Sequence, residues 1–163
     1  MIRYLVAGIA LVLIAACSKS GAPVDAQQLA GVLSGDTKGI AATNPLCKLF
    51  SPDEISAYAG KKLPAGKNAA MGSGCQWIDF QSDDNANVLI QAVPMEYADN
   101  PSGAPGFRKL AELGKGAYVA ADMGGWSAGA PQGGDFVGIV VAGPNASEKT
   151  AIDLMKETLK RRK

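Results

Sequence analysis

Short runs of β-branched, aromatic and small apolar residues recur between residues 75 and 142, most of them bounded by Gly, Asn, Asp or Pro. This pattern is typical of β-strands. It predicts five strands, at Cys75–Phe80, Asn87–Val93, Ala117–Asp122, Trp126–Ala130 and Phe136–Ala142. The first two are expected to pair as a hairpin, and glycine pairs at 124–125 and 133–134 suit tight turns between the last three. An antiparallel sheet is therefore expected.

Helical signals flank these runs. Ser51 is expected to cap a helix with Pro52 at its first position and Glu54 at its third, the arrangement of a capping box. Gly60 is expected to end that helix. Phe107–Leu113 has apolar residues three apart, which predicts a short amphipathic helix.

A longer amphipathic helix is expected over about residues 146–161, capped by Asn145. Its buried stripe is expected at Ile152, Met155 and Leu159. The resulting order is helix, two strands, helix, three strands, helix. This order predicts an α+β fold, in which the helices pack on one face of an antiparallel sheet.

The chain begins like a secretory signal. Arg3 supplies a positive charge, and Leu5–Ile14 is an apolar run too short to span a bilayer comfortably. Two small residues, Ala15 and Ala16, then precede Cys17. This order resembles the lipobox of bacterial lipoproteins, which implies acylation of the Cys17 thiol, cleavage before it and anchoring to a membrane through lipid. An ordinary signal peptide and an uncleaved membrane anchor are the alternatives.

Three segments are therefore expected: a signal peptide at 1–16, a lipidated tether at 17–43 and a globular domain at 44–163. The tether is small and polar and has too few large apolar residues to fold alone. Ser18 follows the acylated cysteine. In a Gram-negative lipoprotein, this residue implies sorting to the outer membrane, facing the periplasm.

The charge balance and the absence of histidine exclude several functions. The chain has 16 basic and 15 acidic residues, so no strong basic field would hold nucleic acid. It has no histidine, which removes Ser-His and Cys-His catalysis and most zinc, copper and iron sites. No cofactor is expected, although oxygen-ligated calcium and carboxylate chemistry stay open.

The chain has three cysteines. With Cys17 assigned to lipid, Cys47 and Cys75 form an even pair in an oxidising compartment. A disulfide between them is the expected outcome. A reactive or metal-binding pair is the alternative, but two thiols without histidine make a poor ligand set.

Other candidate sites have simpler structural interpretations. Gly125–Gly129 matches the G-x-S-x-G motif of esterases but has no histidine partner, so a hairpin strand is expected there. Trp77 and Trp126 are candidates for an exposed interaction surface, with burial in the core as the alternative. An acidic stretch could bind calcium or form a solvated turn; it comprises Asp79, Asp83, Asp84 and Asn85.

The first helix and the following strand together carry a recognisable pattern of spacings. Small actinobacterial lipoproteins with a domain of unknown function open on a similar pattern, which here reads Cys47-x-Leu49-x-Ser51-x-x-Glu54-Ile55, then Gly60, then Cys75-x-Trp77. The resemblance covers about residues 44–163 and implies a fold similar to the PsbP-like α+β sandwich. Its motifs mark structure, and the family has no established active-site residues to transfer.

Two functions from different classes follow as expectations. The first is a non-enzymatic binding module that acts on another envelope protein, for example in an inhibitor or immunity-type role. The second is a carrier or sensor of a small apolar or lipid-like ligand, held between the sheet and the helices. An open apolar cavity would favour the second, and a filled core with an exposed apolar patch would favour the first. An enzyme that uses carboxylates ranks third.

Overall fold

A computed structural model describes residues 44–69, 72–79, 85–98 and 100–163. The expected signal peptide and tether, including Cys17, lie outside these residues. Within the described ranges, no helix is both long enough and apolar enough to cross a membrane. The elements, in chain order, are η1 (Pro45–Lys48), α2 (Pro52–Ala59), β1 (Lys67–Ala69), β2 (Gly74–Ile78), β3 (Asn87–Pro94), η3 (Met95–Tyr97), β4 (Arg108–Lys109), η4 (Ala111–Leu113), β5 (Tyr118–Asp122), β6 (Gly125–Gln132), β7 (Asp135–Ala142) and α3 (Glu148–Arg161), where η marks a 3-10 helix.

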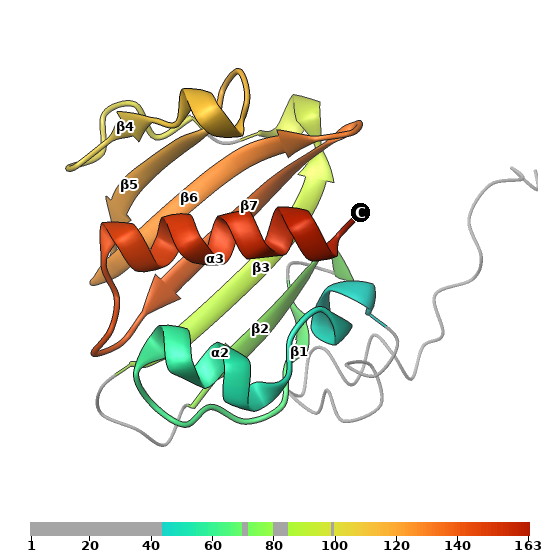
Figure 1. Cartoon of the computed structure of the whole chain (residues 1–163), viewed down its shortest axis with the longest axis vertical. Coiled ribbons are helices and arrows are strands. Elements are labelled where there is room, and N and C mark those ends of the chain that lie inside the picture. Colours follow the sequence, from blue (N-terminus) through green and yellow to red (C-terminus); the bar gives the residue numbers. More distant parts are fainter. Residues whose placement is uncertain (1–43, 70–71, 80–84, 99) are drawn as a thin grey trace, which may run out of the picture.

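The strands form one seven-stranded sheet in the order β1-β2-β3-β7-β6-β5-β4, and all neighbouring pairs are antiparallel (Figure 1). The expected hairpin of β2 and β3 is confirmed. Two-residue turns join β5 to β6 and β6 to β7, and both place a glycine at positive φ: Gly124 at 84° and Gly133 at 62°. The β6–β7 hairpin brings β7 into the middle of the sheet beside β3.

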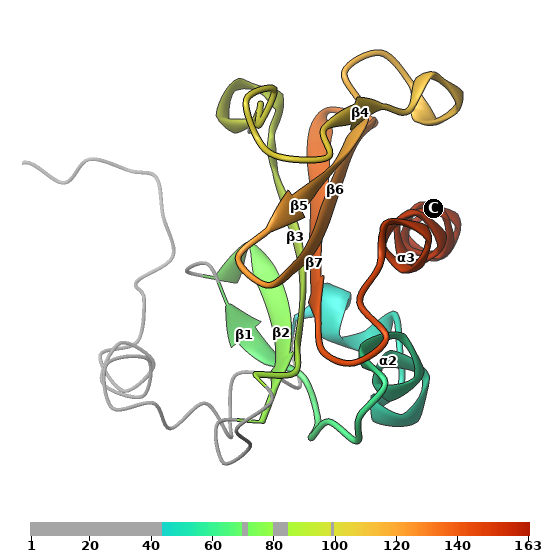
Figure 2. The ribbon, with the colours of Figure 1, turned by 90° about the vertical axis from the view of Figure 1, so that its left-hand side faces the viewer.

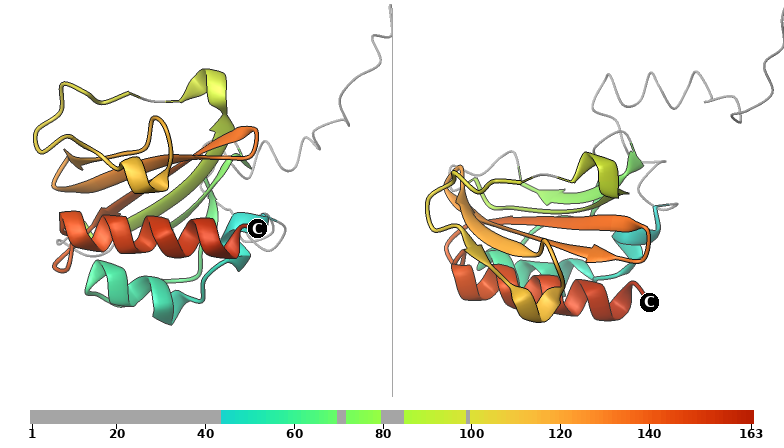
Figure 3. Two further views of the ribbon diagram at one scale, coloured as in Figure 1. Left: turned by 45° about the horizontal axis from the view of Figure 1, so that its top comes forward. Right: turned by 90° about the horizontal axis from the view of Figure 1, so that it is seen from above.

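Both helices lie on the same face of the sheet (Figures 2 and 3). We call this the helix face and the opposite one the outer face. Side chains at alternate strand positions meet α2 and α3 in a continuous core, and many are fully buried, among them Val88, Ile90, Val119, Val137, Val141, Leu154 and Met155. The α+β prediction is thereby confirmed. Of the expected stripe on α3, Met155 is fully buried, whereas Ile152 and Leu159 are only partly buried.

The first helix begins and ends as its sequence predicts. The Ser51 hydroxyl accepts from the backbone N–H of Glu54, and the Glu54 carboxylate accepts from the backbone N–H of Ser51, so the capping box is complete. Gly60 ends α2 in the left-handed conformation with φ of 76°. A Cβ atom on Gly60 would lie 2.6 Å from the side chain of Asn145, so glycine also permits this close approach.

The cap expected for the last helix is wrong. Asn145 instead serves the C-terminal end of α2, where its backbone N–H donates to Ala59 O at 3.2 Å and its side chain to Ala57 O at 3.1 Å. Ser147 caps α3, and its hydroxyl accepts from the backbone N–H of Thr150 at 3.1 Å. Unpaired carbonyls at the end of α2 thus obtain a donor from the segment that leads into α3.

The amphipathic helix expected at Phe107–Leu113 is also wrong. Residues Arg108 and Lys109 form β4, which pairs with the edge of β5, and only Ala111–Leu113 makes a 3-10 turn. An isolated helix of seven residues is marginal, whereas pairing satisfies backbone groups along an open sheet edge. Another departure is β1, a three-residue strand inside the segment 61–74 that was expected to be a loop.

The expected disulfide between Cys47 and Cys75 is present, with Cα atoms 5.2 Å apart. It joins η1 to β2 across a sequence separation of 28. Closing a loop of this length stabilises a domain by about 3–4 kcal/mol in the chain-entropy account. The buried Asn44 side chain strengthens the same junction, because its amide donates to Gly74 O at 2.7 Å.

Arg161 ties the end of α3 to the start of α2. Its guanidinium donates to Glu54 Oε1 at 2.8 Å, to Glu157 Oε1 at 2.7 Å and to Leu49 O at 2.7 Å. It also lies 4.3 Å from the centroid of the Phe50 ring. The hydrogen bond from Arg161, and then those from Ser51, lower the pKa of Glu54 from 4.5 to about 2. Part of the basic C-terminal sequence therefore holds the two helices together.

Glu54→Gln is expected to lower the melting temperature at pH 7. The difference in melting temperature from the natural chain should shrink in acid. Because the pKa is depressed in the folded chain, the Glu54 charge stabilises the fold above pH 4.5, and this contribution is lost as the pH falls from 4.5 toward 2. Glutamine at the third helical position also suits a capping box, so the variant mainly removes charge.

Melting curves between pH 7 and pH 3 measure the effect. Glu112→Gln, on the exposed 3-10 helix η4, is the charge-matched control and should change little across this range. A difference between Glu54→Gln and the natural chain that stays constant down to pH 3 would contradict the ion-pair account.

Candidate binding site on the outer face of the sheet

The outer face has its own small apolar cluster. Tyr118, Ala120 and Phe136 are buried there although no α-helix covers them. The chain between β3 and β4, which includes η3, crosses only the upper part of this face (Figure 2) and contributes partly buried residues, namely Ala98, Ala104 and Phe107. Among the described residues, the rest of the face has no covering layer, so the two sides of the sheet differ sharply in cover.

Three aromatic rings from distant parts of the chain stack in this cluster. The ring centroids of Phe107 and Tyr118 lie 6.1 Å apart, and those of Tyr118 and Phe136 also lie 6.1 Å apart. Gly129 of β6 pairs with Tyr118 of β5 and with Gly138 of β7, which is two residues from Phe136. A Cβ atom on Gly129 would approach both rings to 2.6 Å. Glycine at 129 therefore leaves the space that the stack occupies.

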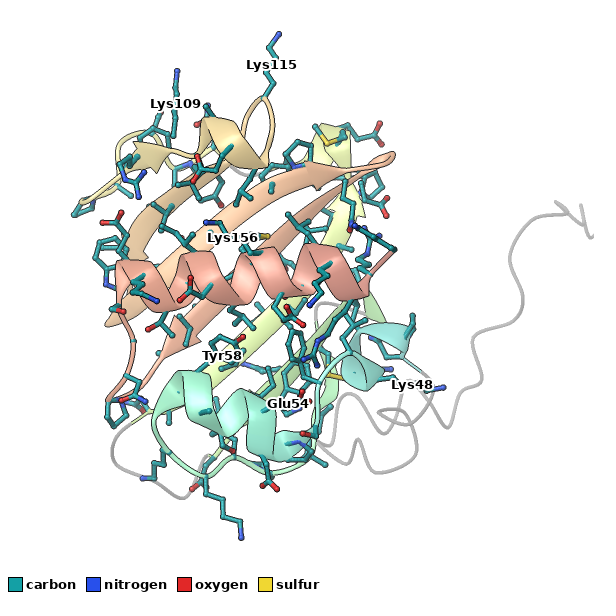
Figure 4. The ribbon with its side chains drawn as sticks, in the orientation of Figure 1. Lys48, Glu54, Tyr58, Lys109, Lys115 and Lys156 are labelled. Atoms are coloured by element: carbon teal, nitrogen blue, oxygen red, sulfur yellow. A yellow bond between two sulfur atoms is a disulfide. The ribbon has the colours of Figure 1, made fainter. Side chains whose placement is uncertain are left out.

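A pocket of about 500 Å³ opens beside this stack. Its apolar lining comes from both loops that flank the stack and comprises Met95, Ala98, Phe107, Ala111, Ala117, Tyr118 and Phe136. Lys109 and Lys115 also line it and are exposed to solvent. Figure 4 shows both lysines projecting from this end of the molecule. No acidic side chain is among the described residues that line the pocket.

A shallower groove of about 180 Å³ runs across the open part of the outer face. Leu89, Gln91 and Val140 form part of its floor, and Tyr97 lies at its side. Tyr97 is 70% exposed and its neighbour Met95 is 44% exposed, so two large side chains of η3 meet solvent beside the groove. These exposed side chains and the groove together form a continuous feature of the outer face.

On the helix face, fully buried side chains of the sheet and of α3 fill the core between them. The hollows at the edges of this layer are smaller, at about 310 Å³ beside Tyr58 and about 290 Å³ beside Lys156. A ligand held between sheet and helices, as the sequence led us to expect for a carrier, does not fit this packing. The structure instead has an apolar pocket of about 500 Å³ on the opposite side of the sheet.

The two tryptophans do not form an exposed surface. Trp77 is only 1% exposed, because it stands at an inward position of β2 and belongs to the core on the helix face. Trp126 is half-buried against the same core, close to Gly106. The expectation of an interaction surface at Trp77 is therefore wrong, and burial in the core, the stated alternative, applies.

The remaining sequence candidates that the structure describes do not assemble a reactive group. Ser127 of the G-x-S-x-G motif lies buried within strand β6, and its hydroxyl donates to Ala120 O at 3.4 Å. Asp83 and Asp84 lie outside the described residues. In the part of the chain that is described, no three Cys, Asp or Glu side chains gather as metal ligands.

Sequence reasoning missed the aromatic stack, although part of its signal was present. Tyr118 and Phe136 each lie near the start of an expected strand, on the face opposite Val119 and Val137. The sequence predicts a helix at Phe107, so it gives no reason to place this ring beside Tyr118. Tyr118 and Phe136 become neighbours only because β5, β6 and β7 pair side by side. Local sequence patterns do not specify this strand order.

Gly129→Ala is expected to destabilise the domain by about 1–3 kcal/mol, the usual range for overpacking a filled site. The added methyl group would force Tyr118 or Phe136 to move. Gly134→Ala is the matched control, because a Cβ atom there meets no atom within 4 Å. Urea unfolding of both variants measures the effect. Equal unfolding free energies for the two would show that the stack does not require glycine at 129.

Comparison of the chain with models of protein families, with curated proteins and with solved structures found no match. The resemblance to actinobacterial lipoproteins therefore stays a prediction from the sequence.

Proposed function

We propose that this chain is a lipid-anchored protein of the cell envelope whose folded domain is a non-enzymatic binding module. It acts on another envelope protein through the outer face of its sheet. The proposed anchor is lipid on Cys17, and the proposed location is the outer membrane, facing the periplasm. These two proposals rest on the lipobox-like sequence alone.

One observation carries the binding role: the helix face is filled, whereas the outer face exposes Met95 and Tyr97 beside a groove. A filled core with an exposed apolar patch favours a protein partner. Tyrosine and methionine are also enriched in protein interfaces relative to the rest of the surface. The proposed partner therefore covers the groove and the 3-10 helix η3.

The rigid frame supports an inhibitor or immunity-type role as a concrete version of this function. The Cys47–Cys75 disulfide fixes η1 to β2, and the contacts of Arg161 join α3 to the start of α2. A preorganised surface loses less conformational entropy on binding than a flexible one. The sequence has no histidine, so imidazole-based catalysis is not an alternative to partner binding in this chain.

A second candidate function is a carrier or sensor of a small apolar ligand. The pocket of about 500 Å³ favours it, because its volume lies in the range of ligand sites and its lining is mainly apolar. Its place is the outer face, beside the stack of Phe107, Tyr118 and Phe136, not the space between sheet and helices.

The protein-binding role can be tested by photocrosslinking in cells. A photoreactive phenylalanine analogue at position 97 is expected to give a discrete adduct with an envelope protein, because Tyr97 lies within the proposed interface. The same analogue at position 123 is the control, since Met123 is fully exposed at the tip of the β5–β6 hairpin. Adducts are read by immunoblotting and mass spectrometry.

Cys17→Ala adds a second arm to this experiment. If Cys17 carries the lipid anchor, the variant should leave the salt-washed membrane pellet and give less of the adduct at position 97. Retention of the variant in the pellet would contradict the anchor. Identical adduct patterns from positions 97 and 123 would contradict the assignment of the outer face as the binding surface.

A further inference from the structure

We propose that the pocket beside the aromatic stack binds a single-chain anionic amphiphile, such as a fatty acid or a lysophospholipid with an exposed phosphate. The apolar chain lies along Phe107, Tyr118 and Phe136, and the anionic head lies at the mouth beside Lys109 and Lys115. The inference rests on the second candidate function, because it names the class of ligand that the same pocket would hold, and it requires neither a protein partner nor the lipid anchor.

The apolar part of the ligand follows from the walls of the pocket. Its inner wall is the face and edge of stacked aromatic rings, and Met95, a flexible and polarisable side chain, lies at one side. Such a surface suits an alkyl chain of variable shape better than a rigid polar molecule. The pocket opens to solvent where exposed residues line it, so a chain can enter from the end.

The charge of the head group follows from the side chains that line the mouth. The lining has two lysines and no carboxylate among the described residues. Glu96 and Glu112 are sequence neighbours of lining residues but do not line the pocket themselves. Arg108 is engaged elsewhere, in an ion pair with Glu148. The charged side chains among the described residues of this lining are therefore both basic, which suits an anionic head group.

Other hollows of the molecule lack this combination. The groove across the outer face includes Asp122, and the hollow beside Tyr58 includes Asp153. A third hollow, near the C-terminal end of α3, has Lys156, Lys160 and Lys163, but it measures about 290 Å³ and no aromatic ring lines it. Among the described residues, aromatic walls and a purely basic rim thus occur together at one pocket.

The test uses the full chain, isolated as a bacterial host processes it and held in phosphatidylcholine nanodiscs. The probe is a twelve-carbon fatty acid that carries a photoreactive diazirine, and labelled peptides are mapped by mass spectrometry. We expect saturable labelling within residues 95–118 or at Phe136. Dodecanoate and dodecyl phosphate should compete, whereas dodecanol should compete weakly and dodecyltrimethylammonium should not. Which of the two anions competes better separates a fatty acid from a phosphate-bearing lipid.

Two double variants, each of which replaces two lysines by glutamine, remove the same amount of positive charge. Lys109→Gln with Lys115→Gln should weaken competition by dodecanoate about threefold to tenfold, the range for two exposed charge contacts. Lys48→Gln with Lys156→Gln removes the same charge from exposed positions away from the pocket (Figure 4) and should leave it unchanged. Ala111→Trp, a substitution at an exposed lining position, should block labelling without disturbing the core.

Chain length gives an independent measurement. Each methylene that enters the pocket should tighten competition about fourfold until the pocket is full. Equal competition by dodecanoate and dodecanol, or equal loss in both lysine pairs, would overturn the anionic site. Labelling that is not saturable, or that maps to other residues, would overturn the pocket itself. Neither result bears on the crosslink at position 97, so the two proposals fail separately.

Discussion

Alternation of side chains across a single sheet is the constraint on which the rest of this structure depends. Seven antiparallel strands present two faces, and both α-helices cover the same one. On that side, Leu154 and Met155 of α3 complete a filled core. On the other side, the segment that includes η3 is the one part of the described chain that gives cover, and that cover is partial. A small aromatic cluster, a pocket and exposed side chains therefore stay accessible there. The candidate site therefore lies on the face of the sheet that α2 and α3 leave uncovered.

The helix face is held by a few contacts between segments that are far apart in the chain. The disulfide attaches η1 to β2, and Arg161 attaches the last helix to the first through Glu54 and the carbonyl of Leu49. Glu54 serves twice, because it closes the capping box of α2 and accepts from Arg161. A frame fixed in this way keeps the outer face in one arrangement, which suits a surface that binds without catalysis.

The features that sequence predicted correctly depend on neighbours along the chain. The capping box at Ser51, the glycine turns and the β2–β3 hairpin each have a local signal, and the disulfide followed from parity of cysteines. The failures depend on tertiary neighbours. The sequence predicts a helix at residues 107–113, but part of this segment pairs with the edge of β5. The sequence also predicts that Asn145 caps α3, but its side chain donates to a carbonyl near the end of α2. The candidate pocket required the strand order, since β5, β6 and β7 must be adjacent before the aromatic rings can stack around Gly129.

The central claim is that the outer face is the binding face of the protein in its own envelope. Hydroxyl-radical footprinting compares the purified chain with the chain in intact cells, and methionine and tyrosine are reactive probes. Met95 and Tyr97 lie on the proposed surface, and Met123 lies on an exposed hairpin tip. The account predicts that Met95 and Tyr97 are oxidised in the purified chain and protected in cells, whereas Met123 is oxidised in both. Equal oxidation of Met95 and Tyr97 in both settings would contradict it.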